Sequence, residues 1–157
     1  MKIHYSLPAT LVAILVVSIL NSCSPVEPRE RTDFGSDWAF LSGDDSLAMQ
    51  AGYDDSSWRK LRLPHDWSIE GEFSEKHPAT PGGGALPGGV GWYRKTFSLN
   101  ESVKERKFFI EFDGVYMNSK VWINGHLLGE RPNGYVSFRY ELSPYLRFGE
   151  GQENILA

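Results

Sequence analysis

The sequence predicts an all-β fold, and both its composition and its periodicity support this. It contains 16 glycines and nine prolines, and 13% of its residues are aromatic. This composition favours short strands joined by tight turns. Apolar and polar residues alternate with a period of two in several segments, and no long segment has the 3.6-residue period of an amphipathic helix. Together these features predict a β-sandwich.

Strand-like segments recur along the chain from residue 34 onward. A short strand is expected within 34–41, and the alternation of Leu61 and Leu63 suggests another that Pro64 stops. Segment 44–50 is compatible with a loop or an edge strand. The other expected elements are strands at 91–99, 108–113, 136–142 and 154–157, a hairpin at 119–129, an Asx-type turn or one turn of helix at 54–58, and a helical turn within 143–148.

The hairpin is the strongest local signal. Asn124-Gly125 lies between two apolar-rich runs, and these two residue types accept the positive φ angles of a type I′ turn at little cost. Because side chains alternate along a strand, Val121 and Ile123 should point to one face of the sheet and Trp122 to the other.

Residues 64–91 show little periodicity, and their prolines and glycine-rich turns exclude a long regular element. The glycine-rich tract 82–89 is not a phosphate-binding loop. Pro87 interrupts it, the Gly-Lys-Ser/Thr of a P-loop is missing, and a strand rather than a helix follows. The tract is therefore expected to be a connector.

Charge and residue usage exclude several functions. Beyond residue 22 the chain has 15 Lys and Arg against 20 Asp and Glu, a net charge of −5, with no basic run, so nucleic acid is not an expected partner. The histidines are scattered, and no metal-binding spacing occurs. The single cysteine, Cys23, excludes an intrachain disulfide. No metal and no cofactor is expected in this chain.

Residues 1–22 have the features of a cleaved signal peptide. Lys2 precedes an almost uncharged apolar run at 7–20, which is too short to span a membrane comfortably. Residues 20–23, Leu-Asn-Ser-Cys, resemble a bacterial lipoprotein cleavage box, although Asn21 is unusual at its position. We expect lipid on Cys23, a tether at 23–33, and a lipid-anchored protein of the bacterial cell envelope, at the periplasmic or outer-membrane surface.

Longer motifs resemble a known family. Leu-Pro-His-Asp-Trp at 63–67, Gly-Trp-Tyr-Arg at 91–94, the hairpin motif at 112–129 and segment 134–146 are similar to the N-terminal sugar-binding domain of glycoside hydrolase family 2. This family comprises β-galactosidases, β-glucuronidases and β-mannosidases. The resemblance covers about 34–157 and implies a jelly-roll, galactose-binding-like sandwich. Residues 131–135 and 138–140 look like the galactosidase branch.

The resemblance also implies the role of this domain. In the family, the two catalytic carboxylates belong to a later barrel domain, and no motif for them is found in this chain. The full-length parent is then a retaining glycosidase acting on a β-linked galactoside or related oligosaccharide, and its barrel is a partner of this non-catalytic domain. Segment 154–157 starts an apolar run that stops abruptly, so the domain is expected to be truncated at its last strand.

The candidate site follows from the same resemblance. In the family, the chain leaves the sandwich near the position of 64–67 and sends a loop into the sugar pocket, so Asp66 is the best candidate to bind a sugar hydroxyl. The alternative is an Asp that caps the following turn. The neighbouring His65 and Trp67 are candidate substrate-binding residues or packing residues.

Two other functions remain open. One is a free-standing carbohydrate-binding lipoprotein without catalysis, and the other is a structural or adhesive lipoprotein that has no positive motif.

Overall fold

The computed structural model describes residues 29–77 and 84–157. The chain divides into two compact units, 1–33 and 34–157, and the second is the folded domain considered below. The predicted signal peptide and Cys23 lie outside the described residues. Within the described ranges, no helix combines the length and apolar character that crossing a membrane would require.

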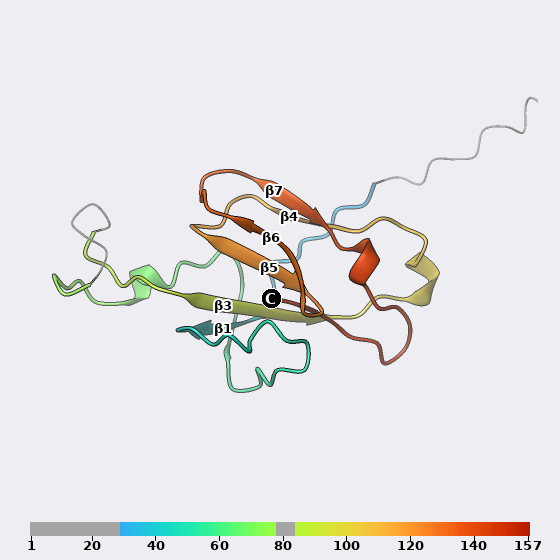
Figure 1. Cartoon of the computed structure of the whole chain (residues 1–157), viewed down its shortest axis with the longest axis horizontal. Coiled ribbons are helices and arrows are strands. Elements are labelled where there is room, and N and C mark those ends of the chain that lie inside the picture. Colours follow the sequence, from blue (N-terminus) through green and yellow to red (C-terminus); the bar gives the residue numbers. More distant parts are fainter. Residues whose placement is uncertain (1–28, 78–83) are drawn as a thin grey trace, which may run out of the picture. The chain divides into compact units, whose positions relative to one another are not determined.

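The domain consists of two antiparallel sheets (Figure 1). The larger has six strands in the order β2-β1-β3-β8-β5-β6, and the smaller pairs β4 with β7. The described residues contain three short 3₁₀ turns and no α-helix, so the predicted all-β sandwich is confirmed. The strands are β1 (Trp38–Ser42), β2 (Arg59–Leu61), β3 (Gly91–Phe97), β4 (Phe109–Phe112), β5 (Ser119–Ile123), β6 (His126–Arg131), β7 (Phe138–Glu141) and β8 (Asn154–Leu156).

The main core lies between the two sheets. Ile110 of β4 is buried in one cluster with Val121 and Ile123 of β5 and Leu156 of β8. The residues alternate as predicted, since Ile110 is buried whereas Phe109 is 45% exposed. Burial of these side chains is what holds the two-stranded sheet against the larger one.

The hairpin forms as predicted. Asn124 and Gly125 have φ angles of 51° and 84°, and β5 pairs with β6 on either side of them. The Asn124 side chain also acts at long range: its Nδ2 donates to Oδ1 of the fully buried Asn154 at 2.9 Å, and its Oδ1 accepts from the Ile155 backbone N–H at 2.8 Å. The turn is therefore joined to the central strand β8.

The first strand starts at Trp38, directly after Asp37 with its positive φ of 59°, and contains Trp38 and Phe40 as expected. Segment 44–50, which the sequence left open, forms turns rather than a strand. It covers the outer face of the larger sheet, where Ala48 is buried with Ala39 and Trp58 in a second cluster. Trp92 and Trp122 stack on the same outer face at 5.3 Å between ring centroids, as expected for a Trp122 that points away from the main core.

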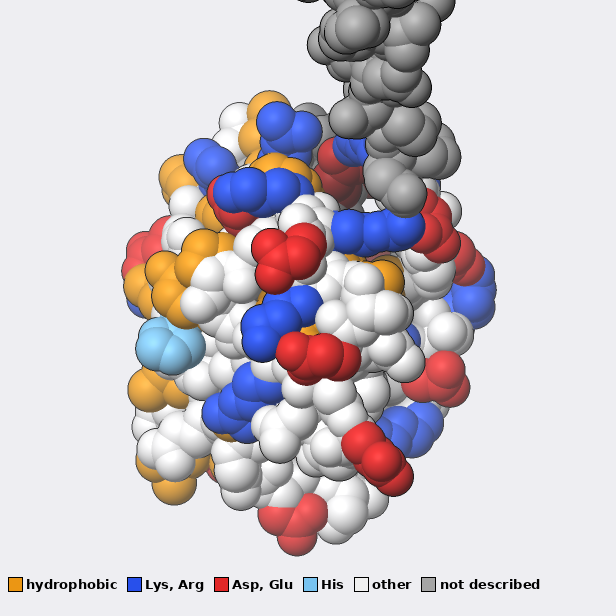
Figure 2. Space-filling model, turned by 90° about the vertical axis from the view of Figure 1, so that its right-hand side faces the viewer, with side chains coloured by type: hydrophobic (Ala, Val, Ile, Leu, Met, Phe, Trp, Pro, Cys, Tyr) orange, Lys and Arg blue, Asp and Glu red, His pale blue; other side chains and the backbone are white. Residues whose placement is uncertain are grey.

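The topology gathers three loops at one end of the sandwich. Because β8 is antiparallel to both β3 and β5, the starts of β3 and β5 lie at the same end, together with the end of β6. Loops 64–90, 113–118 and 132–137 therefore share this end, on the left of Figure 1. We call it the long-loop end. The opposite end carries residues 143–153, and there acidic and basic side chains are intermixed on the surface (Figure 2).

Candidate functional site

The candidate site lies in the loop that connects β2 to β3. The described limbs of this loop run side by side: the Ser74 N–H donates to the Ala85 carbonyl at 3.0 Å, and a Cβ on Gly71 would lie 2.2 Å from Cγ of Pro87. This close approach requires glycine at 71. A 3₁₀ turn at Ser68–Glu70 is the only regular element in the described part of the loop, so no long regular element forms there, as the sequence predicted.

Asp66 is exposed and lies two residues before this turn. Its Oδ1 accepts from the Ser68 backbone N–H at 3.0 Å and from Ser68 Oγ at 2.6 Å. Oδ1 of Asp66 therefore caps the following turn, as the alternative interpretation of this residue predicted. Among the described residues, Oδ2 has no hydrogen-bond partner, so this oxygen is available to accept a hydrogen bond from a ligand.

His65 lies at the centre of a polar network. Its side chain is only 11% exposed, and its Nδ1 lies 2.9 Å from the Tyr93 hydroxyl. Its Nε2 lies 3.2 Å from Glu70 Oε1 and 2.9 Å from Arg59 Nη2, while Arg59 donates to Glu70 Oε2 at 2.7 Å. The ring also packs edge-on against Phe40 at 5.0 Å. These contacts fix the start of the loop to the sheet.

The network shifts the pKa values of two of its members. The hydrogen bond from Arg59, followed by that of His65, lowers the pKa of Glu70. Burial, reinforced by the negative charges of Asp66 and Glu70, raises the pKa of Tyr93 to about 12. Tyr93 therefore remains neutral and able to hydrogen-bond across the physiological range.

Trp67 is half-buried and packs over the start of β3. A Cβ on Gly91 would lie 2.9 Å from Trp67 Nε1 and 3.1 Å from Phe40 Cε2, so the indole needs glycine at this position. Of the three predicted site residues, Asp66 is exposed, whereas His65 and Trp67 make packing contacts with the domain itself. Whether any of them binds a sugar stays a prediction.

Sequence reasoning did not identify Arg59, Glu70 and Tyr93 as members of this site. No local pattern could have joined Tyr93 to the site, because it lies on a different strand and meets His65 only in the folded domain. In the described part of the chain, no group of three or more His, Cys, Asp or Glu side chains is placed to hold a metal ion. The site offers hydrogen-bonding oxygens and aromatic surface, which are suited to binding.

The fold and the candidate site define a β-sandwich domain with hydrogen-bonding groups on a long loop at one end. The family model described as "Glycosyl hydrolases family 2, sugar binding domain" matches residues 77–156, which is half of the chain. The chain therefore belongs to this family, as its motifs indicated.

Individual relatives and a solved structure support the same family assignment. The chain is 59% identical over 137 residues to "Beta-galactosidase BoGH2A" of Bacteroides ovatus, covering 87% of this chain and 16% of that protein. It is 48% identical over 122 residues to a "Putative beta-glucuronidase" of Formosa agariphila, covering 78% and 12%. A crystal structure of a β-glycosidase from Bacteroides vulgatus superposes with a TM-score of 0.74 at 48% identity, covering 78% of this chain and 16% of that one.

The chain thus spans about one sixth or less of the length of these relatives. It corresponds to the N-terminal sugar-binding domain of β-galactosidase- and β-glucuronidase-like glycoside hydrolases.

Proposed function

We propose that this domain is part of a secreted β-galactosidase-like enzyme that hydrolyses terminal β-glycosides with retention of configuration. The observation that carries the proposal is the 59% identity to a β-galactosidase over 87% of the chain. Retaining hydrolysis uses two carboxyl groups about 5 Å apart, and we assign these to the barrel of the longer parent. The ligand is a β-linked galactoside or a related oligosaccharide.

The domain's own contribution is the loop at 64–91, with Asp66 as the residue that binds a sugar hydroxyl. Asp66 is exposed and its Oδ2 has no hydrogen-bond partner among the described residues, while Oδ1 is held by Ser68, which fixes the orientation of the carboxylate. A carboxylate accepts hydroxyl hydrogen bonds with charge-assisted strength. A hydrogen bond to a hydroxyl near the cleaved bond strengthens as the sugar ring flattens toward the transition state.

The test is Asp66→Ala in the full-length parent. Loss of a charged hydrogen bond of about 1.5–3 kcal/mol should lower kcat/KM by roughly ten- to a hundredfold. Asp66→Asn should preserve the turn, since an amide oxygen also accepts from Ser68, and yet still reduce kcat/KM because the charge is gone.

Asp54→Ala is the matched control. Asp54 is exposed and lies outside the candidate loop. Its Oδ1 accepts from the Ser56 N–H at 3.0 Å, which is the same turn contact that Asp66 makes with Ser68. Both Ala variants should lower the melting temperature to a similar small extent, but only Asp66→Ala should impair catalysis. Normal kinetics for Asp66→Ala would remove Asp66 from the site and leave it a turn residue.

We also propose that the parent is held at the bacterial cell envelope by lipid on Cys23, as the cleavage-box resemblance at 20–23 supports. In this arrangement the tether at 23–33 separates the sugar-binding domain from the membrane.

A further inference from the structure

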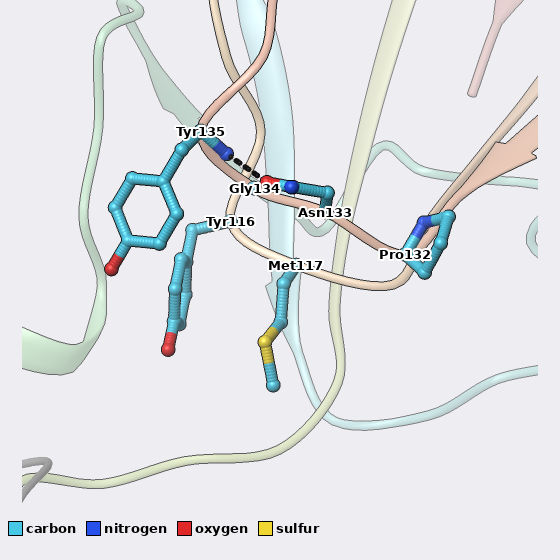
Figure 3. Close-up of a pocket in the computed structure, with 6 residues that line it drawn as sticks. All are labelled: Tyr116, Met117, Pro132, Asn133, Gly134 and Tyr135. Carbon is cyan, nitrogen blue, oxygen red and sulfur yellow. Dashed lines mark hydrogen bonds between the residues drawn. The ribbon is translucent and has the colours of Figure 1, made fainter.

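A cleft separate from the Asp66 site lies at the long-loop end, formed by loops 113–118 and 132–137. Its volume is about 380 Å³, and its most prominent residues are Tyr116 and Tyr135, which are 71% and 86% exposed. Their ring centroids are 5.6 Å apart with the planes at 68°. Figure 3 shows both rings and the Met117 side chain extending to the same side of the loops. We call this the tyrosine cleft; it is lined by Tyr116, Met117, Pro132, Asn133, Gly134 and Tyr135.

Backbone contacts hold the two loops of the cleft together. The Asn118 N–H of one loop donates to the Pro132 carbonyl of the other at 3.3 Å. Within loop 132–137, the Tyr135 N–H donates to the side-chain Oδ1 of Asn133 at 2.8 Å. A Cβ on Gly134 would lie 2.8 Å from Cα of Tyr116, so the loops approach as closely as glycine permits. The cleft is therefore preorganised, which reduces the entropy lost when a ligand binds.

The chemistry of the cleft suits a neutral, hydroxyl-rich ring. None of its six lining residues is charged, and the nearby Arg131 places its guanidinium over the Phe138 and Tyr140 rings, at 5.6 Å from each centroid. Within the described ranges, the hydroxyls of Tyr116 and Tyr135 make no hydrogen bond, and the side-chain nitrogen of Asn133 donates none. Apolar surface with a few convergent polar groups is typical of small-ligand sites, and tyrosine combines a rigid apolar face with a polar tip.

We propose that the tyrosine cleft binds a pyranose ring of a neutral glycan, as a subsite additional to Asp66. The C–H face of the sugar lies against the tyrosine rings, and its hydroxyls bond to the phenol oxygens and the Asn133 amide. Both loops lie at the end of the sandwich that carries loop 64–90, and both fall within the part of the chain that matches the sugar-binding family model. The ligand class therefore rests on the proposed function.

The experiment measures binding rather than hydrolysis, so that its failure is distinct from a failure of the Asp66 proposal. The ¹⁵N-labelled 157-residue chain is titrated with galactose, lactose and cellotetraose, and amide shifts are followed by NMR. Shifts are expected in loops 113–118 and 132–137. Combined Tyr116→Ala and Tyr135→Ala substitution should weaken binding by about tenfold or more.

Two variants make the result specific. Tyr145→Ala removes a tyrosine that is 39% exposed at the opposite end of the domain, and it should bind the sugars as the unmodified chain does. Asp54→Ala, at a position between β1 and β2 and outside the three loops of the long-loop end, should also retain the shifts in the cleft. Unchanged resonances of Ile110 and Ile123, both in the main core, would verify that the double variant is folded.

The proposal is overturned if none of the three sugars shifts the cleft amides, or if the double variant binds as tightly as the unmodified chain. Protection of the cleft amides from hydrogen exchange in the sugar-free full-length parent would also overturn it, since the tyrosines would then be a protein-docking face. If the double variant proves unfolded, Tyr116→Phe and Tyr135→Phe together serve instead, and unchanged affinity in that variant refutes the hydroxyl contacts.

Discussion

Replacing Arg94 with Met should strongly destabilise the domain. Arg94 is 1% exposed, and its guanidinium lies under the loop that follows β1. Its Nε donates to Asp55 Oδ2 at 2.9 Å, and its terminal nitrogens donate to the carbonyls of Ala48, Gln50 and Tyr53. Met fills most of the same volume without offering any donor.

The expected loss is about 3–5 kcal/mol, the usual cost of removing one partner of a buried ion pair. The Asp55 side chain is only 20% exposed and would lose its cation. The Ala48 and Tyr53 carbonyls would lose this donor, while the Gln50 carbonyl would still accept from the Tyr53 N–H. For a domain of this size, the loss corresponds to a fall in Tm of about 10–20 °C. Because total stability is typically about 5–15 kcal/mol, a large fraction of it depends on this one side chain.

Urea denaturation followed by tryptophan fluorescence measures the effect, since Trp58 is buried in one cluster with Ala48, whose carbonyl Arg94 binds. Arg139→Met is the matched control: Arg139 is exposed on β7, and its loss should cost less than about 1 kcal/mol. A loss below about 1 kcal/mol for Arg94→Met as well would refute the reasoning, because it would show that the covering loop does not depend on the guanidinium.

Three further predictions concern other parts of the chain. Gly91→Ala should cost about 1–3 kcal/mol in urea denaturation, because its Cβ would meet Trp67 and Phe40; Gly52→Ala, with nothing within 4 Å of its Cβ, should change little, and equal costs would contradict the packing argument. Tyr93 should titrate near pH 12 rather than 10. The unfolded chain then loses this proton at a lower pH than the folded chain, so the contribution of Tyr93 to stability is full below pH 10 and falls as the pH rises toward 12. Subtracting the ultraviolet pH titration of the Tyr93→Phe variant from that of the unmodified chain isolates the ionisation of Tyr93, and ionisation near the ordinary tyrosine value would count against the prediction. Cys23→Ala should move the parent from the detergent-extracted membrane to the soluble fraction in a bacterial host, whereas Ser24→Ala should not; an unchanged distribution of the Cys23→Ala variant would mean that the apolar segment itself holds the protein.

Features that depend on neighbouring residues could be predicted from the sequence. The type I′ turn at Asn124-Gly125 follows from the backbone preferences of two adjacent residues. The inward and outward alternation of Ile110 and Phe109 follows from the two-residue period of a strand. The family could be recognised because its motifs are continuous in the chain.

Only the tertiary structure decided which polar residues are buried and which loops meet. In β3 the alternation of apolar and polar residues does not predict that both Arg94 and Lys95 are buried. They are buried because Asp55 lies against the first and the Phe34 ring against the second, and both partners are distant in sequence. The His65–Tyr93 contact and the tyrosine cleft have the same origin. Strand order brings these segments together, and strand order is set by burial summed over the whole sandwich, which no local pattern encodes.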